Sequence, residues 1–219
     1  MAHIYADTFS HYGFSGQRCE GNLVNSEEIR LHMKDSDILD YIQSKADSFF
    51  GRIAASATRG LGHACVADFP DRPYLEWEFS YENGIPSPLR KNQETYMQAC
   101  ENLFDFFSKF KAAAPQYAEV AEARNFETIR ATVAEILAFE GKKDERGEKW
   151  QGAAIAGRLL FAGAIPEYRH NAFREELEAV SKLTERNAHN QRVWHFTRGV
   201  EVMRGMILNE LLPERNLIG

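Results

Sequence analysis

A stripe of apolar residues runs through the last part of the chain, from Leu183 to Leu212. Its members recur at steps of three and four residues, the spacing that places side chains on one side of an α-helix. They are Val193, Phe196, Val200, Met203, Ile207 and Leu211. Trp194, Met206 and Leu208 widen this apolar face, so the sequence predicts a central helix that the rest of the chain covers on more than one side.

Shorter helical patterns precede this run, and most of them have a start signal. Ser36 or Asp37 begins a stripe that reaches Ala57, and Asn125 precedes another stripe that Gly141 ends. A further helix is predicted to begin at Asn25, which forms a capping box with Glu28. Three more are predicted from Ser87 to Pro115, from Trp150 to Ile165 and from Phe173 onwards. The charged residues 142–149 are predicted to form a loop.

One segment has the two-residue period of a β-strand, which places alternate side chains on opposite faces. Its inward positions are Leu75, Trp77, Phe79 and Tyr81, and Glu76 and Glu78 are expected to face solvent. Residues 64–69 are the predicted partner strand, and Asn83-Gly84 favours a tight turn after the second strand. The sequence therefore predicts one small hairpin at about 63–84.

Residues 1–22 fit no helical period, although they carry several aromatic side chains among Gly and Ser: Tyr5, Phe9, Tyr12 and Phe14. This composition predicts an extended arm or short strand, whose aromatic residues are buried against their own domain or a neighbouring subunit. The opening of the arm, an acidic residue and Phe followed by His-Tyr, resembles the start of some phage structural proteins.

The patterns together predict a mainly α protein, a multi-helix bundle of six or seven helices with one small β-hairpin and an extended N-terminal arm. Residues 1–22 are predicted to be the arm and residues 23–219 a single helical domain. A chain of 219 residues with 44% hydrophobic residues is long enough to bury one sizeable core.

Composition and charge restrict the compartments and the classes of partner that we expect. The formal net charge is −6, and such a chain has no global attraction for nucleic acid or anionic lipid. The longest apolar stretch, 152–166, is shorter than the ~20 residues that span a bilayer. The three cysteines form no CxxC pair, and the N-terminus lacks the features of a signal peptide. We therefore expect a soluble protein of the reducing cytoplasm.

The sequence gives no reason to expect a metal or a cofactor. His63, Cys65 and Asp68 are suitable ligand types beside the predicted hairpin, but two or three such residues more commonly serve a turn and a buried thiol. No Glu-x-x-His pair of a di-iron bundle occurs, and Gly60 and Gly62 lack the spacing of a phosphate-binding loop. We expect neither a metal nor a cofactor.

The densest polar group lies at residues 185–195, where Glu185 and His189 are four residues apart on one helical face. The Arg-Asn followed by His resembles the polar motif of HEPN-family ribonucleases, which cleave RNA at a dimer interface. This resemblance implies catalytic roles for Arg186, His189 and His195. In that family four to six residues separate Arg from His, whereas here two or eight do. The alternative interpretation is a structural polar face of the helix.

The leading functional hypothesis is a protein-interaction or assembly protein, possibly a homo-oligomer or a subunit of a larger phage-like particle. Residues 1–22 are the predicted contact with a protein partner or a second copy, because an irregular segment has difficulty burying its own aromatic side chains. The alternative is a metal-independent ribonuclease of the HEPN type, and only under this alternative is nucleic acid expected as a partner.

Overall fold

A computed structural model of the chain divides into two compact units, residues 1–165 (unit 1) and residues 166–219 (unit 2). The predicted division into an N-terminal arm, residues 1–22, and one helical domain, residues 23–219, stays a prediction. The structure describes residues 2–14, 23–55, 65–117, 125–167, 169, 171–182 and 189–214.

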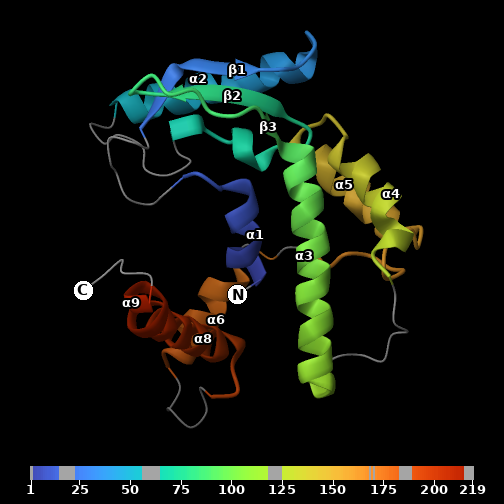
Figure 1. Cartoon of the computed structure of the whole chain (residues 1–219). Coiled ribbons are helices and arrows are strands. Elements are labelled where there is room, and N and C mark those ends of the chain that lie inside the picture. Colours follow the sequence, from blue (N-terminus) through green and yellow to red (C-terminus); the bar gives the residue numbers. More distant parts are fainter. Residues whose placement is uncertain are drawn as a thin grey trace. The chain divides into compact units, whose positions relative to one another are not determined.

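The protein is mainly α with a small antiparallel sheet, as the sequence predicted, and the described residues include seven helices of nine residues or more (Figure 1). The helices of unit 1 are α1 (Ala2–Ser10), α2 (Asp37–Ala55), α3 (Asn92–Ala113), α4 (Glu127–Leu137) and α5 (Lys143–Ile155), with short 3-10 turns η3 (Phe69–Asp71) and η4 (Pro115–Tyr117). Unit 2 holds α6 (Ala172–Val180), α8 (Arg192–Met206), the π-helical η5 (Ile207–Leu211) and α9 (Leu212–Glu214).

Three strands form the sheet of unit 1 in the order β1-β2-β3, namely β1 (Val24–Leu31), β2 (Glu76–Tyr81) and β3 (Arg90–Lys91). Both pairs are antiparallel, and the pairing of β1 with β2 is irregular between Asn25 and Arg30. The predicted turn at Asn83-Gly84 is confirmed, because Gly84 has φ +81° and the amide of Tyr81 donates to the carbonyl of Ile85. The hairpin at about 63–84 is corrected, since β2 pairs with β1 and β3, and the described part of the predicted partner strand, residues 65–69, forms turns instead.

The predicted helix at Asn25 is also wrong, because this segment is strand β1. The side chain of Asn25 does accept a hydrogen bond from the amide of Glu27 at 3.1 Å, as a helix cap would. This local bond occupies the irregular part of the strand, and pairing with β2 decides the backbone conformation.

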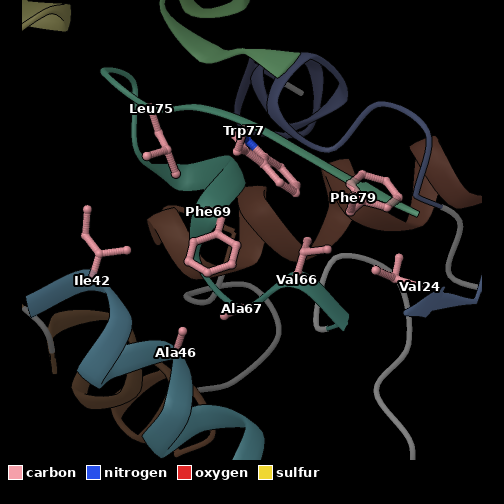
Figure 2. Close-up of a cluster of buried hydrophobic side chains, with 9 residues drawn as sticks. All are labelled: Val24, Ile42, Ala46, Val66, Ala67, Phe69, Leu75, Trp77 and Phe79. Carbon is pink, nitrogen blue, oxygen red and sulfur yellow. The ribbon is translucent and has the colours of Figure 1, made fainter. Parts of the chain in front are cut away.

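The first core cluster lies between the inward face of β2 and helix α2 (Figure 2). Leu75 and Trp77 are fully buried and Phe79 is 2% exposed, which confirms the predicted inward face of this strand. Helix α2 contributes Ile42 and Ala46 to the cluster, as its stripe predicted. The amide of Leu39 donates to the hydroxyl of Ser36, which confirms the predicted start of α2.

Residues 2–10 are the helix α1, which corrects the extended conformation predicted for the N-terminal arm. The four-residue step from Tyr5 to Phe9 is helical, and their rings contact each other edge to face at 5.3 Å. Tyr5 also contacts Phe106 of α3 and donates its hydroxyl to Asn102. Because this stripe holds only two aromatic residues, tertiary contact with α3 supplies the stability that a short helix lacks alone.

The segment after α1 is held by a buried arginine at the start of β3. Arg90 is 4% exposed, and its guanidinium donates to the carbonyls of Ser10 and Tyr12. The same group lies over the rings of Tyr12, Phe14 and Trp77 at 3.9, 4.9 and 5.1 Å from their centroids. Burial lowers the pKa of Arg90. Carbonyl dipoles and aromatic faces therefore compensate this cation.

The second core cluster joins α3, α4 and α5 with the segment that follows α5. Its buried members are Phe126, Ile129, Val133, Ile136, Leu137, Ala153, Ala154 and Leu159. The predicted end of α3 before Pro115 is confirmed. The predicted start of α3 at Ser87 is corrected to Asn92, because the Ser87 hydroxyl accepts from the amide of Phe79 instead.

Helix α5 begins within the charged segment 142–149 that was predicted to be a loop. Glu145 accepts a hydrogen bond from the amide of Lys142 at 2.7 Å, and this contact together with Asp144 stabilises the first turn. The helix ends at Ile155, ten residues before the predicted end, because Gly157 takes the left-handed conformation with φ +67°. The amide of Arg158 then bonds to the carbonyl of Ala153 at 2.9 Å.

Unit 2 corrects the central helix predicted for residues 183–212. The described part of this run consists of α8, η5 and α9, and none of its residues belongs to either core cluster. Val193 is buried, whereas Phe196 is 61% exposed. Polar residues 189–191 interrupt the apolar pattern, and a turn precedes the helix there. Periodicity thus identified the apolar positions of the helix but not which of them are buried.

Candidate functional site

The residues predicted to be catalytic in the ribonuclease hypothesis are only partly described. His189 and His195 contact Trp194, with ring centroids 4.4 and 5.2 Å from the indole. Arg186 lies outside the described residues, as does its neighbour Glu185. The structure therefore brings the two histidines to one aromatic ring, and a phosphodiester site with Arg186 stays a prediction.

Glu176 of α6 supports the start of α8 beside these histidines. Its carboxylate accepts from the amide of Val193 at 3.0 Å and lies 3.6 Å from the guanidinium of Arg192. A carboxylate at the first turn of a helix satisfies an amide that has no partner within the helix. The sequence carried no signal for this contact, because residue spacing alone does not tell which side chain of α6 lies beside the start of α8.

The predicted metal-ligand types near residue 65 have other roles or lie outside the described part. His63 is outside it, and Asp68 binds the guanidinium of Arg72 at 2.7 Å. Within the described residues, no group of three His, Cys, Asp or Glu side chains has a geometry that holds a metal ion.

A polar cluster of unit 1 lies where α1, η3, α3 and α5 meet. His11 contacts the carboxylate of Asp71 at 3.2 Å, and the guanidinium of Arg146 donates to the carbonyl of the same residue. The Tyr96 hydroxyl donates to the carbonyl of Pro70 at 3.0 Å. The cluster thus links the N-terminal helix to the middle of the unit through one imidazole and one phenol.

The environment of Tyr96 keeps its phenol protonated. Burial, together with the negative charge of Asp71, raises the pKa of Tyr96 to about 12. A hydrogen bond with Ser10 and the positive charge of Arg146 act in the opposite direction. A phenol in this state donates a hydrogen bond and is a poor proton acceptor at neutral pH.

We expect the substitution Tyr96→Phe to lower the free energy of unfolding by about 1 kcal/mol at neutral pH, because it removes the bond to Pro70. The pKa of Tyr96 is higher in the folded chain, so its contribution is present below about pH 10 and is lost between about pH 10 and 12. Ultraviolet titration of Tyr96→Phe should lack the tyrosine component that titrates near pH 12 in the wild type. Tyr12→Phe, which retains the ring over Arg90, should retain this component.

The sequence did contain a signal for part of this cluster. His3 and Asp7 are four residues apart on one side of α1 and lie 3.4 Å from each other, and His11 follows at the same spacing directly after the helix ends. The irregular pattern of aromatic residues obscured this period. The position of Asp71 opposite His11 required the fold, because 60 residues separate the two.

A separate apolar pocket of about 320 Å³ opens between α3, α4 and α5 in unit 1. Its walls are Cys100, Leu103, Phe104 and Phe107 from α3, Phe126, Ile129 and Val133 at α4, Trp150 from α5, and residues 159–161. None of these side chains is charged, and Phe107 and Phe161 are about half exposed. A concave, mostly apolar site of this size is typical of a small-molecule pocket.

Arginine–glutamate pairs connect the elements around this pocket. Arg130 of α4 pairs with Glu101 of α3 and with Glu127. Arg158 pairs with Glu135 of α4 and precedes residues 159–161 of the pocket wall. These pairs connect α4 to both neighbouring walls. At the pocket itself, burial raises the pKa of the Cys100 thiol, with a smaller effect from Glu101, so this wall is neutral.

Unit 2 carries an exposed apolar surface, which we call the α6–α8 face and define as Phe173, Leu177, Phe196 and Val200. Each helix contributes two of these residues four positions apart, so the two pairs run along the helices. The rings of Phe173 and Phe196 meet edge to face at 5.3 Å. Between 42% and 61% of each residue of the face is exposed.

Comparison with known proteins gives a family but no reaction. The model of a protein family described as a family of unknown function (DUF6765) matches residues 1–211. No curated protein and no solved structure matches the chain. No helix of the described residues is long and apolar enough to cross a membrane.

Proposed function

We propose that this chain, which belongs to the DUF6765 family of unknown function, is a protein-interaction protein that assembles with a second copy of itself through the α6–α8 face. The observation that carries the proposal is that the Phe196 side chain is 61% exposed although its ring contacts the ring of Phe173. Clustered apolar residues on a protein surface usually mark a contact site.

The geometry of two packed helices supports a second copy as the partner. A pair of helices has one shared apolar face, and two such pairs bury their faces together in a four-helix arrangement. Val193 of α8 is 3% exposed and does not belong to the α6–α8 face, so that face remains available to a partner. A symmetric dimer uses the same patch on both copies, so no further surface is required.

Three arginines of unit 2 pair with glutamates of α6 or α8. Arg169 lies 3.4 Å from Glu175, and Arg198 lies 3.1 Å from Glu201. Glu176 is engaged with Arg192 and the start of α8. Paired charges at the edge of an interface reduce the repulsion that an acidic chain otherwise has for its copy.

The N-terminal residues support assembly less well than the sequence suggested. Tyr5 and Phe9 contact each other, and Tyr5 contacts Phe106 of the same chain. We therefore place the proposed contact on the α6–α8 face rather than on residues 1–22. The cytoplasm is the proposed compartment, because the cysteines form no disulfide framework in the sequence. The ribonuclease alternative and membership of a larger particle stay predictions.

We expect light scattering to give twice the 25.0 kDa chain mass for the wild type, and the single-chain mass for Phe196→Glu. The charged side chain would have to lose its water in the interface, so we expect the dimer dissociation constant to rise at least about a hundredfold.

Val202→Glu is the matched control, because Val202 lies on the same helix and is 60% exposed but is not part of the α6–α8 face. This variant should remain a dimer, and circular dichroism should show that both variants are folded. A monomeric wild type at every concentration, or equal loss of the dimer in Val202→Glu, would contradict the proposal.

A further inference from the structure

We propose that the apolar pocket between α3, α4 and α5 binds a small uncharged molecule that is largely aromatic or aliphatic. This activity is separate from the proposed assembly, because every residue of the pocket lies in unit 1 and every residue of the α6–α8 face lies in unit 2.

The volume sets the size of the ligand. The pocket measures about 320 Å³. This is roughly twice the ~150 Å³ of an apolar cavity that holds benzene, so a molecule of about a dozen carbon atoms fits. Phe107 and Phe161 are 53% and 47% exposed, which leaves an open side for entry.

The walls select against charge. The residues that line the pocket include no acidic or basic side chain, and the most polar atoms among them belong to Cys100 and Trp150. Arg130 lies over the ring of Phe126 at 5.3 Å, but Glu101 and Glu127 already pair with its guanidinium. A bound carboxylate would lose its water without gaining an ion pair from the lining residues, and this cost disfavours anionic ligands.

Contacts outside the pocket hold its walls in place. Arg130 of α4 pairs with Glu101 of α3, which connects these two helices. Glu135 of α4 pairs with Arg158, which connects α4 to the segment after α5. That segment turns back at Gly157 and is held by the bond from the Arg158 amide to the carbonyl of Ala153. When a ligand enters a pocket whose walls are already held in place, the free-energy cost of ordering those walls is small.

Naphthalene is a suitable probe, and 1-naphthoate is its charged counterpart. We expect naphthalene to bind the full-length protein with a stoichiometry of one per chain, measured by calorimetry, and we expect 1-naphthoate to bind at least about tenfold more weakly. Peptide mapping by mass spectrometry should show that saturating naphthalene slows alkylation of Cys100, which lines the pocket. Equal affinity for the two compounds would overturn the selectivity.

The variant Leu103→Trp places a larger side chain in the pocket and should weaken naphthalene binding by at least about tenfold. Leu103 is only partly buried, so the substitution is made at the margin of the core. Phe110→Trp, on the same helix but outside the pocket, should change the affinity less than about twofold.

Absence of naphthalene binding to the folded wild type would overturn the proposal, as would an equal loss in the two tryptophan variants. If Leu103→Trp fails to fold, protection of Cys100 in the wild type still decides the question. Unchanged alkylation of Cys100 at saturating naphthalene would place the compound elsewhere and contradict the inference.

Discussion

The substitution Trp77→Ala is expected to lower the free energy of unfolding by about 3–5 kcal/mol, because it removes a fully buried indole and leaves a cavity. The indole is stacked on Phe79 with ring centroids 5.5 Å apart and contacts Phe69 at 5.8 Å. Figure 2 shows Trp77 between Phe79 of the same strand and Leu75, which directly precedes the strand, so the cavity would open among the residues of the cluster. Chemical denaturation measures this effect.

Glu76→Gln is the matched control for this prediction. Glu76 is adjacent on the same strand but points to the exposed face. Removal of its charge should change the free energy of unfolding by less than about 0.5 kcal/mol, since surface substitutions away from special contacts have small effects. Comparable losses in the two variants would mean that the stability of this strand does not depend on the inward face.

The substitution Asn92→Asp is expected to destabilise the protein by about 3–5 kcal/mol at neutral pH, although the two side chains have nearly the same shape. Asn92 is 5% exposed and uses its whole amide. Its nitrogen donates to the carbonyls of Phe69 and Arg72 at 2.7 and 2.9 Å, and its oxygen accepts from the Trp77 indole. A carboxylate there would face two carbonyl oxygens with no proton to donate.

The loss should depend on pH in a defined direction. Burial and the two carbonyls favour the neutral acid, so the folded pKa of the new carboxyl lies above its unfolded value of about 3.9. The deficit relative to wild type should therefore shrink as the pH falls through the folded pKa. Asn83→Asp is the control, because Asn83 lies in an exposed turn where its oxygen only accepts, from the amide of Ile85. A deficit that is independent of pH would contradict this account.

Local sequence patterns correctly predicted the elements in which the periodic apolar residues are also the buried ones. The alternation at Trp77 and Phe79 gave the correct inward face of β2, and the cap at Ser36 gave the start of α2. Patterns failed where a distant partner decides the backbone. Asn25 has a helix-like side-chain bond but pairs in a sheet, and α1 carries too few apolar residues to be recognised without α3.

The candidate sites were less predictable than the fold, because periodicity says which side of a helix is apolar and not what covers it. Cys100, Leu103 and Phe107 recur at helical steps along α3, which is the spacing of a covered face, and in the structure they line an open pocket. Phe196 and Val200 were expected to be covered, and both are exposed. The pairing of His11 with Asp71 depends on a tertiary contact that no local spacing contains.

The arginine that holds the N-terminal segment also has a consequence for the order of folding. Seventy-eight residues separate Arg90 from Tyr12, whose carbonyl it binds. During synthesis, residues 10–14 therefore leave the ribosome well before the residue that fixes them, and closing so long a loop is slow relative to local helix formation. Attachment of the N-terminal segment is accordingly expected to be a late event, in which the guanidinium loses its water as the aromatic rings of the segment close over it.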